Sequence, residues 1–174
     1  TKVVIDNAAY LYGQGKITAL VVIAPNGVHR NWLSKEIPDH MPEWCPSRTV
    51  YYHSGMRKKE LEAFDEVLAE TEKLKVFSFN VEAFVSDKAV ALMKRVLLSN
   101  DVMLVVDESS RIKRPGAKRT KIITRFSNMA KYRRIMTGTP VTKGPEDVYS
   151  QFKFLDPHIL GYDSFYSFRA RYCV

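Results

Sequence analysis

Two adjacent carboxylates, Asp107 and Glu108, directly follow an uninterrupted apolar run over residues 102–106. Apolar runs without polar alternation are typical of strands buried on both faces of a parallel sheet. Such sheets carry their chemistry just beyond the carboxyl ends of the strands. Asp107 is suited there to bind a Mg²⁺ that bridges phosphates, and Glu108 to orient or deprotonate an attacking water. Considered alone, however, an Asp-Glu pair more often simply begins the next helix.

A turn of Thr137, Gly138, Thr139 and Pro140 follows a second predicted strand, residues 132–136. In a parallel sheet this turn reaches the same edge as the two carboxylates. We expect Gly138 to allow a tight backbone turn and Pro140 to set the direction in which the chain leaves it. Without its surroundings, an ordinary strand-to-helix turn explains the same four residues equally well.

The chain is basic, with a formal net charge of +8, and much of this charge is concentrated in one segment. Residues 111–125 contain seven lysines and arginines and no acid: Arg111, Lys113, Arg114, Lys118, Arg119, Lys121 and Arg125. A run of this kind favours a polyanionic partner such as a nucleic acid. Its attraction to phosphates does not depend on base sequence and weakens steeply with salt.

The remaining pattern alternates between strands and helices. The predicted strands are residues 17–24, 49–53, 75–79, 102–106 and 132–136. Helices are predicted after Pro25-Asn26, over residues 57–73, from Ser86 to residue 97, over residues 122–129, after Pro145 and over residues 165–172. Val148, Phe152 and Leu155 are expected to form the buried face of the helix after Pro145. This alternation predicts an α/β domain with a mostly parallel central sheet flanked by helices.

Composition excludes several other classes of protein. With 174 residues, 45% of them hydrophobic, the chain is long enough to bury the core of one domain. Its longest uncharged apolar stretch, residues 17–25, is too short to span a bilayer, so no membrane partner is expected. Cys45 and Cys173 lack the spacing of a metal site or a disulfide framework. Since no secretion signal is evident either, we expect an intracellular protein, cytoplasmic if bacterial and nuclear if eukaryotic.

Five stretches occur in a characteristic order along the chain. They are VVIAPN at residues 21–26 with Asn31-Trp32, VFSFNVE at 76–82, DESSRIK at 107–113, MTGTP at 136–140 with FLDP at 154–157, and FYSFRARY at 165–172. The ordered set resembles motifs Ia, Ib, II and III and the start of the helical protrusion in the first lobe of Snf-type (Swi/Snf-like) ATPases, within helicase superfamily two. The compact spacing between the motifs resembles bacterial or phage members.

This resemblance implies a RecA-like three-layer fold over residues 1–157, followed by the start of a helical extension at 158–174. It implies ATP and Mg²⁺ as cofactors, with Asp107 as a metal ligand and Glu108 beside the attacking water. The first residues resemble the end of a phosphate-binding loop whose glycines and lysine are absent here. On that interpretation Thr1 supplies a second metal ligand, Lys2 adjoins the nucleotide, and a helix ends at Gly13. The alternative is that Lys2 begins an edge strand.

The resemblance also implies coupling between the nucleotide and DNA through Thr137, Gly138, Thr139 and Ser110. Most of the family has histidine where this chain has Ser110, which puts that coupling in doubt. The residues implied to contact the phosphate backbone, in double-stranded DNA by preference, are Pro25, Asn26, Arg30, Asn80, Arg111, Lys113 and Arg114. His29 is expected to be a surface residue.

A second RecA-like lobe in the same parent chain is the other implied partner. The function expected is therefore the first motor lobe of an ATP-dependent DNA translocase, inactive as an isolated fragment. The alternative is a catalytically silent nucleic-acid-binding module with the same fold. The sequence immediately before Thr1 would separate these two interpretations, because a Gly-Lys pair there is expected only of the motor.

Overall fold

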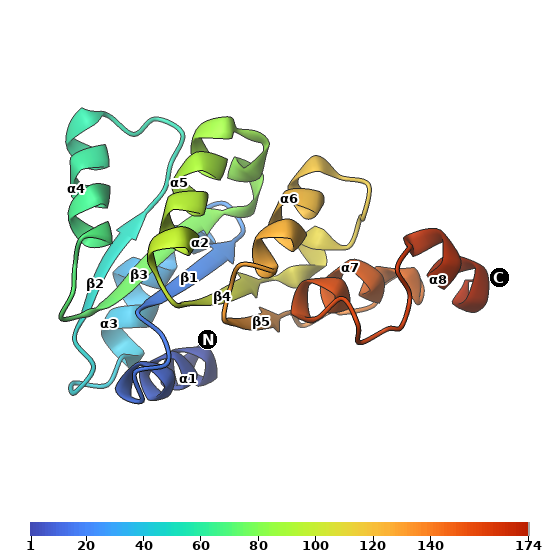
Figure 1. The fold of residues 1–174 in the computed structure, drawn as a ribbon, viewed down its shortest axis with the longest axis horizontal. Helices are drawn as coiled ribbons and strands as arrows, with labels where there is room; N and C mark the ends of the chain where they lie inside the picture. The colour runs from blue at the N-terminus through green and yellow to red at the C-terminus, as the bar shows by residue number, and fades with distance from the viewer. Residues whose placement is uncertain (174) are drawn as a thin grey trace.

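Five short segments rich in Val, Ile, Leu and Phe form one central sheet in the computed structural model, which describes residues 1–173 (Figure 1). The strands are β1 (Ala19–Ala24), β2 (Ser47–Tyr51), β3 (Leu74–Asn80), β4 (Val102–Asp107) and β5 (Tyr132–Met136). They lie in the order β2-β3-β1-β4-β5, and every neighbouring pair is parallel. The prediction of an α/β fold with a parallel sheet is therefore confirmed.

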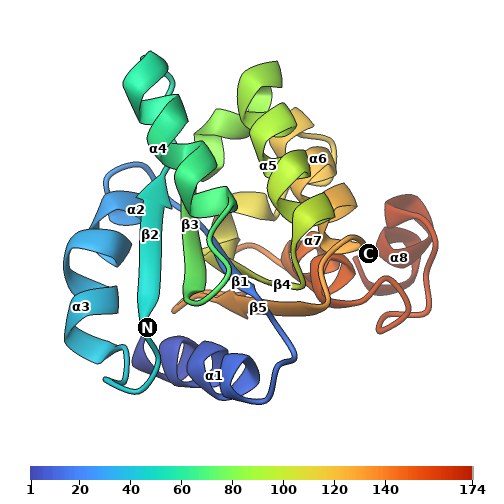
Figure 2. The same cartoon turned by 60° about the vertical axis from the view of Figure 1, so that its left-hand side comes forward.

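Helices cover both faces of the sheet, because alternate strand side chains are apolar in both directions. Val21 and Ile23 of β1 pack under α4 (Lys58–Leu68), α5 (Asp87–Ser99) and α6 (Lys118–Ser127). Leu20 and Val22 face α1 (Lys2–Gly13) and the helix at residues 28–40 on the other side. Figures 1 and 2 show these helices as two layers with the sheet between them, so the predicted three-layer arrangement is confirmed.

The helix after β1 is continuous but irregular. It consists of α2 (Val28–Asn31), a π-helical turn (Trp32–Glu36) and α3 (Ile37–His40). The π-helical turn ends just before Pro38, which has no N–H to complete the α-helical hydrogen-bond ladder. Trp32 and Ile37 point into the core from this helix and are 1% and 3% exposed.

The first residues of the chain are helical. Since α1 begins at Lys2 with Thr1 as its N-cap, the alternative of an edge strand here is wrong. The predicted end of the helix at Gly13 is confirmed, since Gly13 is the last helical residue, and the left-handed backbone follows at Gly15 (φ 65°). Gly13 is tightly packed, since a Cβ there would lie 3.1 Å from the Trp44 ring.

The buried face of α7 (Glu146–Leu155) differs from the prediction. Val148, Phe152 and Leu155 are only half-buried, whereas Tyr149 and Phe154 are 3% and 0% exposed. The helix is rotated because the Asp147 carboxylate, near its start, bonds inward to the preceding loop. Hydrophobic periodicity alone does not reveal a hydrogen-bonded polar side chain of this kind.

The last helix, α8 (Phe165–Tyr172), packs on α7 through Phe168, whose ring lies 5.4 Å from that of Tyr149. The proposed boundary between residues 157 and 158 stays a prediction. Within residues 1–173, no helix combines the length and apolar character that crossing a bilayer demands.

Candidate functional site

The register between β4 and β5 brings the two predicted motifs together. Asp107 is paired with Met136, so Glu108 and Thr137 leave neighbouring strands side by side. The Glu108 Oε1 atom accepts hydrogen bonds from Thr137 Oγ1 at 2.7 Å and from Ser110 Oγ at 2.8 Å. Thr137 Oγ1 in turn accepts one from the backbone N–H of Thr139 at 3.1 Å. Four of the residues predicted to form the site thus belong to one hydrogen-bonded chain.

Glu108 is held in an unusual backbone conformation. With φ at 53°, it is the only non-glycine residue of the described chain in the left-handed region. Such a conformation is uncommon for a side chain of this kind and often accompanies a functional site. The hydrogen bonds from Thr137 and then Ser110 lower the pKa of Glu108, so the carboxylate stays ionised. A carboxylate with a lowered pKa is a weak base, which favours orienting a water over deprotonating it.

Asp107 is positioned by a residue from another element. The indole Nε1–H of Trp32 donates to Asp107 Oδ2 at 2.8 Å. A buried indole N–H normally finds a polar partner, and the 1% exposed Trp32 finds it in this carboxylate. In residues 1–173, Asp107 Oδ1 has no hydrogen-bond partner, which leaves one anionic oxygen available. The position of Trp32 in a helix stripe and a motif of the sequence does not indicate this contact with Asp107.

A carboxylate oxygen of this kind fits Mg²⁺, which prefers oxygen ligands and retains several waters. No three His, Cys, Asp or Glu side chains in the described residues are grouped so that they could hold a metal unaided. A magnesium ion beside Asp107 therefore needs phosphate and water oxygens to complete its coordination.

A second polar contact connects the segment after Glu108 to the end of the Thr-Gly-Thr-Pro turn. Ser109 is completely buried and donates to Gln151 Oε1 of α7 at 2.6 Å. Gln151 Nε2 donates to the carbonyl of Pro140 at 2.8 Å. The two strand ends are thus connected through α7 as well as through Glu108. The sequence offered no sign of this role for Gln151.

Lys113 is engaged within the protein. Its ammonium bonds to Asp147 Oδ2 at 3.1 Å and to Thr142 Oγ1 at 2.9 Å, and the Lys113 and Asp147 side chains are 12% and 10% exposed. Hydrogen bonds from the Thr142 and Lys143 backbone, together with this ammonium, hold the pKa of Asp147 far below its usual range. The expectation that Lys113 contacts a nucleic acid stays a prediction, and a phosphate would have to compete with this ion pair for the ammonium.

Arg111 and Arg114 are exposed and border a hollow of about 680 Å³ beside the Glu108 site. The hollow is also lined by Ser110 and Thr139. Its other basic lining residues are Lys113, Arg119 and Lys143, and its acids are Glu146 and Asp147. Since Asp147 is already neutralised by Lys113, the surface left to a ligand is basic and suits phosphate oxygens.

The remaining residues expected to contact phosphate lie at the ends of β1 and β3. Pro25 and Asn26 form the loop after β1, where Asn26 is exposed and accepts from the N–H of Gly27. Asn80 ends β3, and its Oδ1 atom is buried without a partner. Arg30 is exposed, and its guanidinium lies 5.2 Å from the centre of the Tyr51 ring.

His29 is not the surface residue that was expected. It is 1% exposed and packs edge-on against Tyr51, with neither ring nitrogen hydrogen-bonded within the described chain. Burial is the main cause that lowers the pKa of His29, so the ring is neutral near pH 7. His29 lies on the face of α2 that packs against Tyr51 of β2, a contact that the sequence does not reveal.

Two further expectations are not matched by contacts. Lys2 forms an exposed ion pair with Asp6 at 2.8 Å, and within the described residues no hydrogen bond joins Thr1 or Lys2 to Asp107. Gly138 has a φ outside the left-handed region, and a Cβ there would meet open space. The proposed conformational need for glycine at position 138 is therefore wrong.

Comparisons with known proteins agree with this geometry. The family model described as "SNF2-related domain" matches residues 3–173. A probable ATP-dependent DNA helicase of Arabidopsis thaliana is 27% identical over 152 residues, which is 87% of this chain and 13% of the relative. A DNA annealing helicase and endonuclease of Bos taurus is 25% identical over 154 residues, which is 88% of this chain and 13% of the relative. The chain thus spans only a small part of these relatives.

Among solved structures, the SWI2/SNF2 ATPase core of Sulfolobus solfataricus in complex with double-stranded DNA superimposes with a TM-score of 0.67. It is 22% identical and is matched over 96% of this chain and 31% of its own. At this identity the match supports the fold. None of these proteins comes from a bacterium or a phage, so the expectation about origin stays a prediction.

Proposed function

Because the chain belongs to the family of SNF2-related domains, we propose that it is part of the first motor lobe of an ATP-dependent enzyme that moves along double-stranded DNA. The observation that supports this most is the arrangement of two acids with different surroundings. Asp107 keeps one oxygen free beside the Trp32 contact, whereas Glu108 is hydrogen-bonded to Thr137 and Ser110. Neighbouring carboxylates held so differently are suited to different tasks.

Asp107 would hold the Mg²⁺ of a bound ATP, with Thr1 and Lys2 at the phosphate side of α1. The metal supplies charge neutralisation of the phosphates when it is bound. Trp32 restricts the Asp107 carboxylate to one orientation by occupying Oδ2. Glu108, ionised and fixed by two hydroxyl donors, would orient the attacking water. Positioning of this kind supplies most of the catalysis in phosphoryl transfer.

Thr137 is the residue best placed for coupling. Its hydroxyl contacts Glu108 on one side and the backbone of Thr139 on the other. A change in what Glu108 contacts would therefore be transmitted to the turn and, through Pro140 and Gln151, to α7. Ser110, in place of the family's usual histidine, donates to the same carboxylate oxygen at 2.8 Å. This contact supports retention of a coupling role despite the shorter side chain.

DNA would lie across the carboxyl ends of the strands. Arg111 and Arg114 are exposed beside the catalytic acids, and Pro25, Asn26 and Asn80 follow the neighbouring strands. Arg30 would add a charge at the far end of this row. Contacts of this type position a protein on the phosphate backbone without reading bases. We include Arg111 and Arg114 in the DNA-contact set and leave Lys113 out.

The decisive experiment measures ATP hydrolysis by the parent polypeptide with and without duplex DNA. Glu108→Gln keeps the shape of the side chain but removes its charge, so we expect turnover to fall by about 10²–10³-fold while ATP binding is retained. Glu62→Gln, an exposed change on α4, serves as the matched control. Unchanged turnover in Glu108→Gln would remove the hydrolytic role proposed for this acid.

The DNA contacts are tested separately by titrating duplex DNA at two salt concentrations. Replacing Arg111 and Arg114 together by Gln should weaken binding and lower the slope of log K against log salt by about 2, since each phosphate contact contributes about 0.9. Lys113→Gln should leave that slope unchanged if the protein remains folded. A slope that is the same for the wild type and the double variant would exclude these arginines from the contact set.

A further inference from the structure

The outer edge of β2 has no strand beside it. Because β2 is the first strand in the sheet order and pairs only with β3, one side of its backbone is left without sheet partners. The amide of Tyr52 donates to Ser78 O of β3 at 2.7 Å. Since successive amides of a strand point in alternate directions, those of Thr49 and Tyr51 face away from β3. These outward groups are available to another extended chain.

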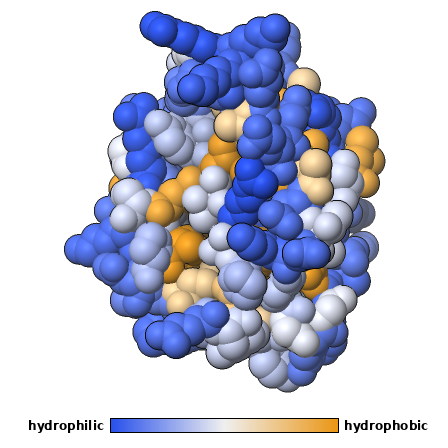
Figure 3. Space-filling view, turned by 90° about the vertical axis from the view of Figure 1, so that its left-hand side faces the viewer, coloured by the Kyte–Doolittle hydropathy of each residue, from blue (hydrophilic) through white to orange (hydrophobic). Residues whose placement is uncertain are grey.

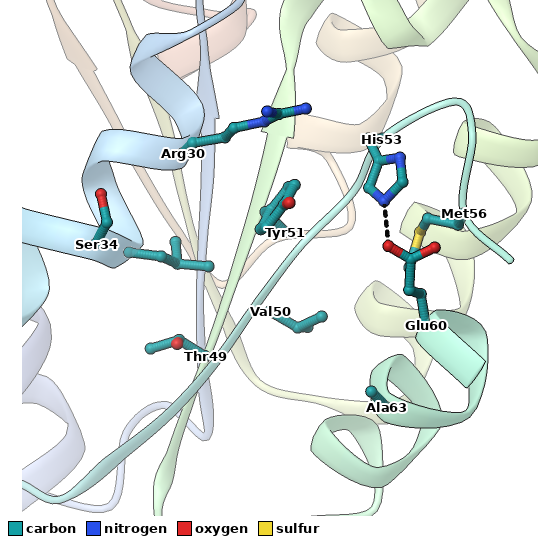
Figure 4. Close-up of a pocket in the computed structure, with 10 residues that line it drawn as sticks. Arg30, Ser34, Thr49, Val50, Tyr51, His53, Met56, Glu60 and Ala63 are labelled. Carbon is teal, nitrogen blue, oxygen red and sulfur yellow. Dashed lines mark hydrogen bonds and ion pairs between the residues drawn. The ribbon is translucent and has the colours of Figure 1, made fainter.

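A hollow of about 590 Å³ surrounds this edge (Figure 4). On the side of the α2–α3 helix it is lined by Leu33 and Ser34, and on the side of α4 by Met56 and Ala63. Figure 3 looks onto this edge and shows apolar side chains at the hollowed centre of the face, surrounded by hydrophilic ones. An edge strand is commonly protected by charge or by a covering loop, and neither protects the centre of this one.

The hollow continues along the strand. A neighbouring hollow of about 380 Å³ shares Leu33 and Thr49 with the first and follows the beginning of β2. Its other lining residues are mainly apolar and include Ile37, Pro38, Met41 and Pro42. Together the two hollows extend along β2 and form an elongated groove. A compact small molecule would fill only part of such a groove. At about 3.3 Å per residue, an extended segment matches this length.

The strand side chains divide the first hollow into two halves. Figure 4 shows Thr49 and Tyr51 on one side of β2 and Val50 on the other. A segment in β conformation also directs successive side chains to opposite faces. One of its side chains would therefore enter beside Leu33, and the next would enter between Val50 and Ala63. Two adjacent apolar residues are the pattern that this shape selects.

Charge at the same place favours an acidic partner. Arg30 lines the hollow above Tyr51, and within residues 1–173 it forms no ion pair with a carboxylate. The acid of the opposite wall, Glu60, is already bonded by His53 Nε2 at 2.8 Å and by the Arg57 N–H at 2.8 Å. Glu60 keeps its charge, but both of its oxygens are already occupied. Arg30 is the charged group of this hollow whose donors have no carboxylate partner, and a carboxylate on the incoming segment would meet it.

We propose that the outer edge of β2 is a docking site for an extended acidic segment of a partner protein. The segment adds a strand beside β2, places two adjacent apolar side chains on opposite sides of the edge, and brings a carboxylate to Arg30. Recognition of this kind obtains affinity from backbone hydrogen bonds and specificity from the alternating side chains. It does not depend on the proposed ATP site, and it shares only Arg30 with the proposed DNA contacts.

The probe for this site is a fluorescent peptide with the sequence Glu-Val-Ile-Val-Thr-Val-Glu, titrated into the 174-residue chain and followed by anisotropy. We expect saturable binding and slower hydrogen exchange at the Thr49 and Tyr51 amides. Ala63→Gln fills the α4 side of the hollow from an exposed position and should weaken binding at least about tenfold. Ala69→Gln, exposed at the end of the same helix, is the matched control and should bind like the wild type. Both variants should melt at the wild-type temperature.

Two altered peptides separate the contributions. N-methylation of alternate amides removes the strand hydrogen bonds and should abolish binding, whereas Gln in place of both Glu residues should weaken it for the wild type but not for Arg30→Ala. Absence of saturable binding, or equal binding of the N-methylated peptide, would overturn the proposal. Displacement of the peptide by duplex DNA from Arg30→Ala as well as from the wild type would assign the edge to DNA. A dimer that Ala63→Gln dissociates would assign it to a second copy of the chain.

Discussion

Replacing the buried Asp147 by asparagine should destabilise the protein markedly. One oxygen, Asp147 Oδ2, accepts four hydrogen bonds. They come from Thr142 N at 2.7 Å, Thr142 Oγ1 at 3.0 Å, Lys143 N at 3.0 Å and Lys113 Nζ at 3.1 Å. The carboxylate therefore fixes the loop after the Thr-Gly-Thr-Pro turn, the start of α7 and the segment that follows Asp107 and Glu108.

The expected size of the effect follows from these contacts. The asparagine oxygen can still accept from the two backbone N–H groups, so the main loss is the charge that balances Lys113. Removing one partner of a buried ion pair costs about 3–5 kcal/mol, because the other charge is left without compensation. Since the pair retains some exposure, we expect the lower end, about 3 kcal/mol. In a domain of this size that corresponds to a melting temperature lower by roughly 6–12 °C.

Urea unfolding of the 174-residue chain at pH 7 measures the change in the free energy of unfolding. Asp39→Asn, an exposed acid on α3, is the matched control and should stay within about 0.5 kcal/mol of the wild type. Lys113→Met and the double variant that combines it with Asp147→Asn complete a double-mutant cycle. The double variant should cost less than the sum of the two single changes, since no unpaired charge remains.

Acid provides a second measurement on the same residue. The folded-state pKa of Asp147 is lowered, first by the Thr142 backbone N–H. The stabilisation is therefore complete above the unfolded pKa, about 3.9, and is lost as pH falls below it toward the folded value. The difference in the free energy of unfolding between the wild type and Asp147→Asn should be constant between about pH 5 and 8. It should become progressively smaller as the pH falls below about 4. A cost below about 1 kcal/mol at pH 7, or strict additivity in the cycle, would refute this reasoning.

Two further predictions concern Asp107 and Glu108 in the parent polypeptide. Trp32→Phe removes the hydrogen-bond donor to Asp107 and should raise the Mg²⁺ concentration needed for half-maximal ATP hydrolysis several-fold. The control Trp44→Phe, at a 62% exposed site, should leave that concentration unchanged. Identical magnesium titrations for Trp32→Phe and the wild type would contradict the orienting role of Trp32. Thr137→Val keeps the shape of the side chain but removes the hydrogen bond that is the main cause of the lowered pKa of Glu108. The acid limb of the pH–rate profile of ATP hydrolysis should therefore move to higher pH. An acid limb at the same pH as in the wild type would exclude this hydrogen bond as the cause.

Much of the fold was predictable because it depends on local pattern. The apolar runs predicted all five strands, and β5 was predicted at its observed bounds. Contacts with other segments caused the errors. Asp147 bonds the start of α7 to the preceding loop, and the buried ring of His29 packs against Tyr51 of β2. Neither effect has a periodic signature, since each depends on a contact with another segment.

For the candidate site, the residue pattern alone indicated which acids and hydroxyls follow β4 and β5, because the carboxyl ends of parallel strands share one edge. Their hydrogen-bond partners became evident only in the folded chain. The contact of Trp32 with Asp107 spans 75 residues, that of Ser109 with Gln151 spans 42, and that of Lys113 with Asp147 spans 34. Contacts between groups so far apart are set by strand order and helix rotation, which emerge only when the whole core packs.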